Sequence, residues 1–209
     1  MKNFIIALIV FCLTCINLFS QSGWFQQNSG TGIWLHSIGF FDSNTGLVTG
    51  YSSSAVLRTT NGGNNWYQSI LNQDSMGFFG LFIINVNTGW IAGNKEPNSP
   101  YPNAVYKTTN SGLNWILQYQ STGRLADIFF INAQTGWIAG QFLLKTTNSG
   151  TNWFIVSSSE YKPTLSVFFL NENTGWVGGN PQSNVSIMKT TNGGSSWVNQ
   201  LMGDHCYSI

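Results

Sequence analysis

The side chains that could carry out acid–base chemistry in this 209-residue sequence are few and widely spaced. Two carboxylates about 5 to 9.5 Å apart can act as the acid and base of glycoside hydrolysis. Asp127 immediately precedes an apolar stretch, whereas Asp42 and Glu172 lie in or near repeated turns and are discounted. The remaining acids fall in variable loops: Asp74, Glu96, Glu160 and Asp204. Because these acids come from separate parts of the chain, we interpret them as solvated surface groups, with a catalytic pair as the alternative.

Metal, nucleophile and cofactor sites are not indicated. His36 and His205 are the only histidines, and their spacing to cysteine is not that of a metal site. Cys206 is the only cysteine beyond the N-terminal segment, so we expect no internal disulfide and interpret it as a small apolar residue. The Gly-Gly pairs follow no strand-to-helix pattern, so they indicate turns rather than a phosphate-binding loop. We therefore predict neither a cofactor nor a metal.

Composition excludes a nucleic-acid binder. Charged residues make up 7% of the sequence, against roughly a quarter in average soluble domains. The eight Lys and Arg residues nearly balance the seven Asp and Glu residues, and they form no basic stripe that could neutralise a phosphate backbone.

The N-terminal segment 1–20 resembles a secretory signal peptide. Lys2 precedes an apolar run from Phe4 to Leu13, and a more polar tail follows. We predict cleavage near Ser20 and a secreted, periplasmic or cell-surface protein with no membrane span after cleavage. A membrane anchor is the alternative, but the run is shorter than the roughly 20 apolar residues that a span requires.

One eight-residue motif occurs four times and organises the rest of the chain. Each copy follows Arg58 or a lysine, and each ends in tryptophan. Asn at the third position can accept hydrogen bonds from later backbone N–H groups, and Gly at the fifth supplies a positive φ, so the motif predicts a tight turn followed by a strand. The structural positions are Thr59, Asn61, Gly63 and Trp66; Thr108, Asn110, Gly112 and Trp115; Thr146, Asn148, Gly150 and Trp153; and Thr190, Asn192, Gly194 and Trp197.

A second repeated module precedes each copy of the first. It begins with an almost continuous apolar run, as expected of a strand buried on both faces, and continues through a Thr-Gly turn into a second strand. The glycines of these turns are 43, 47 and 39 residues apart: Gly46, Gly89, Gly136 and Gly175. Together the two modules predict four short antiparallel strands per repeat, which we name A to D and which are typical of a β-propeller blade.

The eight-residue motif resembles the Asp-box, or BNR, repeat of sialidases and other β-propellers, with Asn in place of the usual Asp. The combination NTGWIAG, KTTNGG and Trp is most similar to the repeat of the photosystem II stability/assembly factor, which also occurs in secreted bacterial proteins. That resemblance implies a propeller acting as a non-enzymatic scaffold. Sialidases use an arginine triad, whereas this chain has only Arg58 and Arg124, so the resemblance does not extend to sialidase activity. Xyloglucan-type glycosidases of similar repeat make a carbohydrate-active propeller the alternative.

The predicted fold is all-β, a β-propeller domain over 21–209 with blades at about 35–70, 78–120, 125–158 and 164–201. Residues 24–27 and 205–209 are predicted to be strands of a partial blade. We therefore expect a fragment of a larger propeller, with a closed four-bladed ring as the alternative.

Binding is expected on one face of this domain. Strand direction alternates, so the A–B and C–D turns share one face, and the irregular D–A and B–C loops share the other, where function usually resides. The candidate binding residues on these loops are Lys95, Glu96, Tyr101, Arg124, Asp74 and Glu160. The predicted function is a secreted scaffold that binds a protein partner or a glycan through this loop face.

Overall fold

The structure is a computed structural model that describes residues 26–51, 56–69, 71, 76–97, 102–156, 164–180 and 185–202. The predicted signal peptide, the partial strand at 205–209 and three candidate binding residues, Asp74, Tyr101 and Glu160, lie outside the described residues. Within the described ranges the regular structure is entirely β-strand, and no helix there is long and apolar enough to cross a membrane.

Each of the four predicted blades is a four-stranded antiparallel sheet whose strands follow one another in chain order. Blade 1 contains β1 (Leu35–Phe40), β2 (Gly46–Gly50), β3 (Val56–Thr59) and β4 (Tyr67–Gln68). Blade 2 contains β5 (Met76–Ile83), β6 (Gly89–Lys95), β7 (Asn103–Thr108) and β8 (Ile116–Ser121). Blade 3 contains β9 (Leu125–Phe130), β10 (Gly136–Gly140), β11 (Leu144–Thr146) and β12 (Phe154–Ile155). Blade 4 contains β13 (Ser166–Phe169), β14 (Gly175–Asn180), β15 (Val185–Thr190) and β16 (Val198–Met202).

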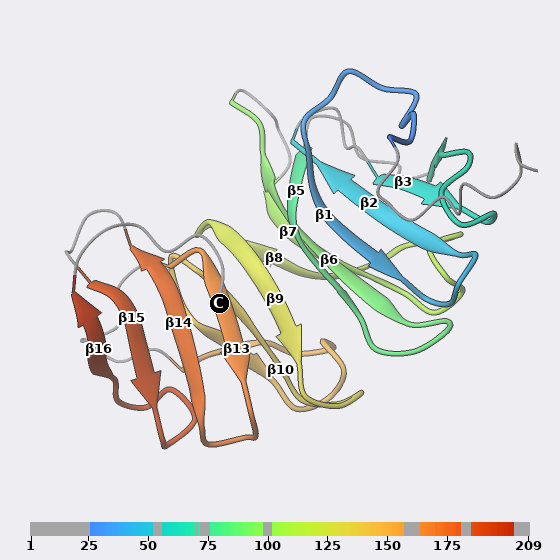
Figure 1. Cartoon of the computed structure of the whole chain (residues 1–209). Helices are drawn as coiled ribbons and strands as arrows, with labels where there is room; N and C mark the ends of the chain where they lie inside the picture. Colours follow the sequence, from blue (N-terminus) through green and yellow to red (C-terminus); the bar gives the residue numbers. More distant parts are fainter. Residues whose placement is uncertain are drawn as a thin grey trace, which may run out of the picture.

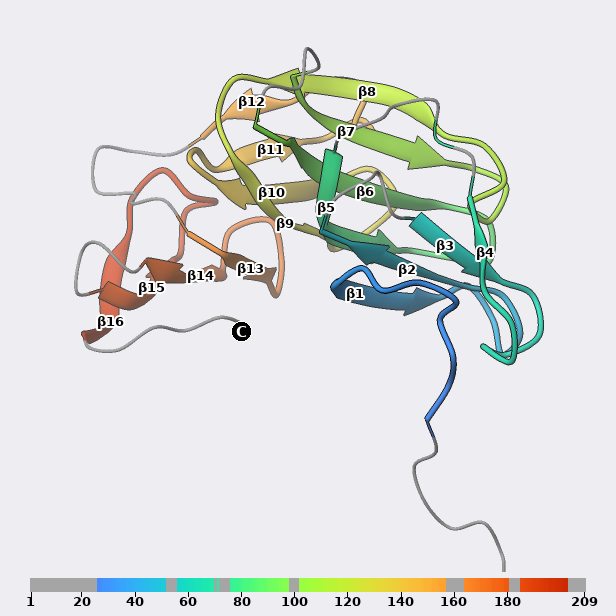
Figure 2. The ribbon, with the colours of Figure 1, turned by 90° about the horizontal axis from the view of Figure 1, so that it is seen from above.

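The blades succeed one another around an arc (Figures 1 and 2). The first strands β1, β5, β9 and β13 are neighbours in that order, so they form the inner side of the arc. The blades were predicted at 35–70, 78–120, 125–158 and 164–201, and the sheets extend from Leu35 to Gln68, Met76 to Ser121, Leu125 to Ile155 and Ser166 to Met202. Of the strand predicted at 24–27, Trp24 and Phe25 lie outside the described residues. Gln26 and Gln27 are in no strand, and Gln27 instead lies against the repeated turn of blade 1.

The eight-residue motif, which we call the box turn, has the same geometry in all four blades. In blade 3 the backbone N–H of Gly150 donates to Thr146 Oγ1 at 2.9 Å, and that of Asn152 donates to Asn148 Oδ1 at 2.9 Å. The threonine hydroxyl also donates to the Asn148 carboxamide oxygen at 3.1 Å. The predicted roles of Asn and Gly are confirmed, and the buried Thr is the additional acceptor that the sequence did not reveal.

Two consecutive residues of each box turn have positive φ, rather than the one predicted. Gly150 has φ of 84°, and the preceding Ser149 has φ of 62°. A left-handed conformation is unfavourable for a serine. Ser149 is held there by hydrogen bonds, because its backbone N–H donates to the Gln134 carbonyl and its hydroxyl donates to the Ala133 carbonyl.

These bonds connect the box turn to the A–B turn of the same blade. The equivalent backbone bond occurs in every blade, from Gly62 to Asn44, Ser111 to Asn87, Ser149 to Gln134, and Gly193 to Asn173, at 2.8 to 2.9 Å. The A–B turns are themselves closed by a side chain, as when the N–H groups of Asn44 and Thr45 donate to Asp42 Oδ1 at 2.7 Å. The prediction that both kinds of turn share one face, here called the turn face, is therefore confirmed.

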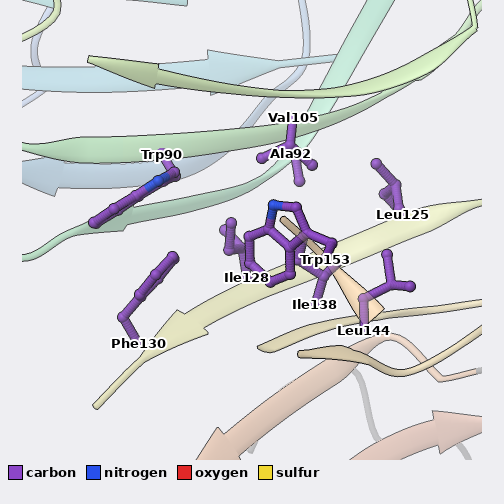
Figure 3. Packing of buried hydrophobic residues seen from close by; sticks show 9 residues of the cluster. All are labelled: Trp90, Ala92, Val105, Leu125, Ile128, Phe130, Ile138, Leu144 and Trp153. Carbon is purple, nitrogen blue, oxygen red and sulfur yellow. The ribbon is translucent and has the colours of Figure 1, made fainter. Parts of the chain in front are cut away.

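The hydrophobic core consists of separate clusters between successive blades. Figure 3 shows the cluster between blades 2 and 3, where the indole of Trp90 is stacked on Phe130 at 3.8 Å. Trp153, from the box turn of blade 3, packs into the same cluster and contacts Phe130 edge-on at 5.9 Å. The box tryptophan therefore stabilises the junction with the preceding blade as well as its own sheet. Burying such large side chains contributes much of the stability of the arc.

Candidate functional site

A groove of about 600 Å³ lies on the face opposite the turn face, which we call the loop face. It is formed between blades 1 and 2 and beside the loop that leads into blade 3. Its walls come from the B–C loops of two blades, the D–A loop after β8, and the first residues of β5. The lining residues are Tyr51, Gly77, Phe79, Asn94, Lys95, Glu96, Pro97, Asn103, Thr122 and Arg124.

The groove brings together the three candidate binding residues that the structure describes. Lys95 and Glu96 come from the B–C loop of blade 2, and Arg124 comes from the D–A loop that precedes β9. Arg124 lies 29 positions after Lys95 and 28 after Glu96 in the sequence. The strands between them return the chain to the same face. With two cations and one anion among its lining residues, the groove carries a small positive charge.

Phe79 forms the aromatic centre of the groove. The Arg124 guanidinium lies over its ring at 5.9 Å, and Tyr51 contacts the ring edge-on at 5.7 Å. His36 contacts it from blade 1 at 5.2 Å, also edge-on. Phe79 remains half-buried, so part of its ring stays accessible in the groove.

A β-bulge places Phe79 in this position. The pairing of β5 with β6 shifts register between Phe78 and Gly80, so Phe78 points into the core while Phe79 stays at the groove. Bulges redirect single side chains in this way. Phe79 and Tyr51 were not among the predicted binding residues. The adjacent aromatic pair Phe78-Phe79 breaks the alternation of apolar and polar side chains along a strand, and this signal could have identified Phe79.

Two asparagines fix the walls of the groove. Asn94 binds the backbone of Leu125 in both directions, donating to its carbonyl at 2.5 Å and accepting from its N–H at 2.7 Å. Asn103 donates to the Gly123 carbonyl at 2.9 Å and accepts from the Lys95 N–H at 3.0 Å. The loops that carry Lys95 and Arg124 are therefore tied to each other before any ligand binds, which lowers the entropy lost on binding.

Asp127, the acid expected near the axis, connects two blades. Its Oδ1 accepts from the Ile128 N–H at 2.8 Å, and its Oδ2 accepts from the Val167 N–H of blade 4 at 3.0 Å and from the Ser166 hydroxyl at 3.4 Å. Burial raises the pKa of this carboxyl above its ordinary value, while the hydrogen bonds and the charge of His36 act in the opposite direction. Both carboxylate oxygens are engaged by protein groups, which indicates a structural role.

The other described acids lie in other blades than Asp127. Hydrogen bonds from the Asn44 and Thr45 N–H groups lower the pKa of Asp42, which closes an exposed turn on the turn face. Glu172 is exposed in the corresponding turn of blade 4, and Glu96 lines the groove. In the described part of the chain, no three His, Cys, Asp or Glu side chains are grouped so that they could hold a metal ion.

The fold of this chain is similar to that of several solved structures, although its sequence has no close match. No protein-family model matches the sequence, and no curated protein matches it either. A structure of YCF48 bound to D1 peptide matches with a TM-score of 0.69 and 16% identity, over 91% of this chain and 61% of that chain. YCF48 from Cyanidioschyzon merolae matches with a TM-score of 0.66 and 17% identity, over 88% of this chain and 61% of that chain. The chain has a β-propeller fold.

Enzymes share this fold. A GH74 enzyme from Niastella koreensis matches with a TM-score of 0.54 and 14% identity, over 79% of this chain and 30% of that chain. The expected resemblance to the photosystem II assembly-factor propeller is thus confirmed for the fold, together with a likeness to GH74 propellers. The chain spans about 61% of the length of the two YCF48 chains.

Proposed function

We propose that this protein is a secreted, non-enzymatic propeller scaffold that binds a polypeptide segment in the groove between blades 1 and 2. The observation that carries the proposal is the arrangement of Arg124 over Phe79, with Tyr51 beside the same ring. Tyrosine and arginine are the side chains most often responsible for binding energy at protein interfaces. The YCF48 structure with a bound D1 peptide supports the proposal, because it shows that a propeller of this type can hold a peptide.

The chemistry of the groove favours a particular kind of segment. Its volume of about 600 Å³ lies within the ~300–1,000 Å³ of typical ligand clefts, so it suits a short stretch of chain. The guanidinium of Arg124 can bind a carboxylate through two parallel hydrogen bonds, and the exposed part of the Phe79 ring can contact an apolar side chain. We therefore expect a peptide that carries an Asp or Glu side chain close to an aromatic or aliphatic one.

Panning a random 12-residue peptide library displayed on phage against the purified protein tests this proposal. Enriched peptides should combine an acidic with an apolar residue, and synthetic copies should bind in calorimetry. Arg124→Ala should weaken binding by about tenfold or more, equivalent to ~1.4 kcal/mol. Arg124→Lys should restore only part of the loss, because lysine cannot form the two parallel bonds.

Leu113→Ala is the matched control. Leu113 is an exposed side chain in the box turn of blade 2, on the turn face, so its truncation should leave peptide affinity unchanged. Peptides that bind the Arg124→Ala and Phe79→Ala variants as tightly as the wild type would refute the proposed groove. Failure to enrich any peptide would refute the proposed ligand class.

The second candidate is a carbohydrate-active propeller. The GH74 neighbours favour it, and burial raises the pKa of Asp127, which is the direction that a general acid of a glycosidase requires. The engagement of both Asp127 oxygens disfavours it, because one accepts from the Ile128 N–H of the same strand and the other from the Val167 N–H of blade 4. Incubation with xyloglucan and measurement of reducing ends distinguishes the two, and we expect no release; release abolished by Asp127→Asn would favour the enzyme.

A further inference from the structure

The junction between blades 1 and 2 is built from different side chains than the junction that follows it. Between blades 2 and 3 the indole of Trp90 is stacked on Phe130 at 3.8 Å. The strand registers place Leu47 and Ile83 at the equivalent positions of the first junction. The first junction therefore has two aliphatic side chains where the second has a stacked aromatic pair.

The first junction also has an arginine where the other blades have lysine. In blade 2, Lys107 Nζ donates to the box-turn carbonyl of Ser149 in the next blade at 3.3 Å. Arg58 makes the equivalent contact through Nε, which donates to the Ser111 carbonyl at 2.7 Å. Within the described ranges the Arg58 side chain makes no further hydrogen bond or ion pair. The N–H groups of its terminal nitrogens are therefore available to an anion.

The outer strand of blade 1 is polar where that of blade 3 is apolar. Residues 67–69 are Tyr-Gln-Ser, and they occupy the positions of Phe-Ile-Val at 154–156. Tyr67 pairs directly with Arg58, so these two side chains lie on the same face of the sheet. The polar replacements of blade 1 are thus grouped around the Arg58 guanidinium.

A cavity of about 250 Å³ lies at this place, between the outer strand of blade 1 and the box turn of blade 2. Ser69 joins its two walls, because its Oγ donates to the Gly112 carbonyl and accepts from Trp115 Nε1 at 3.0 Å. Tyr67 and Leu113 also line the cavity, and they are 64% and 56% exposed. Both walls belong to blades that are packed on each other, so the cavity needs no further blade to form.

We propose that this cavity binds a small hydroxylated carboxylate of the size of a sugar acid, with the carboxylate on Arg58. The terminal N–H groups of a guanidinium can hold a carboxylate through two parallel hydrogen bonds. The Thr60 hydroxyl and the Gln68 carboxamide can pair with ligand hydroxyls, while Tyr67 and Leu113 offer apolar surface to a C–H face. The cavity is smaller than the ~300–1,000 Å³ of clefts for drug-sized ligands, so it suits a single small molecule.

The neighbouring acid Asp42 does not occupy this site. Its Oδ1 accepts from the Asn44 and Thr45 N–H groups of its own turn, and within the described ranges it forms no ion pair with Arg58. The site is also separate from the groove on the loop face, since the two share no lining residue. Binding here is therefore independent of peptide binding in the groove.

Titration with sodium glucuronate, followed by the amide chemical shifts of the protein in NMR, tests the proposal. The amides of Gln68 and Leu113 should shift. Arg58→Lys should raise the dissociation constant about tenfold, because lysine keeps the charge but cannot form the two parallel bonds. This variant should fold, since the other three blades have lysine at the equivalent position. Glucose, which has a CH₂OH group in place of the carboxylate, should bind at least tenfold more weakly.

Lys145→Arg is the matched control. It introduces arginine at the equivalent position of blade 3, where the stacked pair of Trp137 and Phe169 fills the junction, so the affinity for glucuronate should not change. Phe79→Ala should also leave it unchanged, which separates this site from the groove.

Acetate and benzoate test the ligand class. Both should bind more weakly than glucuronate, because acetate lacks hydroxyl groups and a C–H face, and benzoate lacks hydroxyl groups. Binding of either as tight as that of glucuronate would overturn the proposed class. Unchanged affinity in Arg58→Lys, shifts confined to the groove, or no shift with tens of millimolar glucuronate would overturn the site.

Discussion

Replacing Thr146 with valine should destabilise the fold through one buried hydrogen-bond acceptor. The side chain is completely buried, and its Oγ1 accepts from the Gly150 N–H at 2.9 Å and more weakly from the Asn148 N–H at 3.3 Å. Valine has nearly the same shape, so the substitution leaves no cavity and introduces no backbone strain. It leaves the buried Gly150 N–H without its acceptor, and the Asn148 carboxamide without the hydroxyl that donates to it.

The expected magnitude follows from these contacts. A buried donor left without an acceptor destabilises by about 1–3 kcal/mol, so we expect Thr146→Val to lower the free energy of unfolding by about 2 kcal/mol. Thr146→Ser keeps the acceptor and loses one methyl group, which corresponds to about 0.8 kcal/mol. Thr147→Val is the matched control, because Thr147 is the next residue and is exposed.

Urea denaturation followed by tryptophan fluorescence measures these differences, since unfolding separates the stacked indoles from their partners. The order of stability should be wild type and Thr147→Val, then Thr146→Ser, then Thr146→Val. If Thr146→Val were as stable as Thr147→Val, the threonine would not hold the box turn. Equal destabilisation by valine and serine would assign the effect to the lost methyl group instead.

Two further substitutions probe the junctions between blades. Trp137→Ala removes a completely buried indole that is stacked on Phe169. Calorimetry should show a free energy of unfolding lower by about 3–5 kcal/mol. A loss under about 1 kcal/mol would contradict the conclusion that this stacked pair stabilises the junction between blades. Asp127→Asn should gain stability relative to the wild type as pH rises from 3.5 to 7. Burial raises the pKa of Asp127 above 3.8, so the folded wild type loses stability as pH rises through that raised pKa, and asparagine cannot titrate. Urea midpoints at the two pH values check this, and a difference independent of pH would refute it.

The blades could be predicted from sequence because their turns are determined locally. Asn148 and Gly150 perform within a few residues the hydrogen bonding and the positive φ that define the turn, so four copies at similar spacing were sufficient to indicate four sheets. The role of Thr146 was missed because its burial depends on the packed sheet. The positive φ of Ser149 was missed because serine rarely adopts it without tertiary bonds such as the one to Ala133.

The groove was predicted in part. Lys95, Glu96 and Arg124 were assigned to the loop face from strand alternation, and the structure places all three in one groove. Their grouping could not be derived from the sequence, because it depends on the pairing of Asn94 with Leu125 between distant segments. Phe79 was missed for a related reason, since the bulge that redirects it is set by the register of β5 against β6.

Amide hydrogen exchange with and without an enriched acidic peptide tests the central claim most directly, because it locates binding without any substitution. Bound peptide should slow exchange at the backbone amides around Phe79, Lys95 and Arg124, while the box turns on the turn face remain unchanged. Protection confined to the turn face, or binding with no change at the groove, would contradict the account.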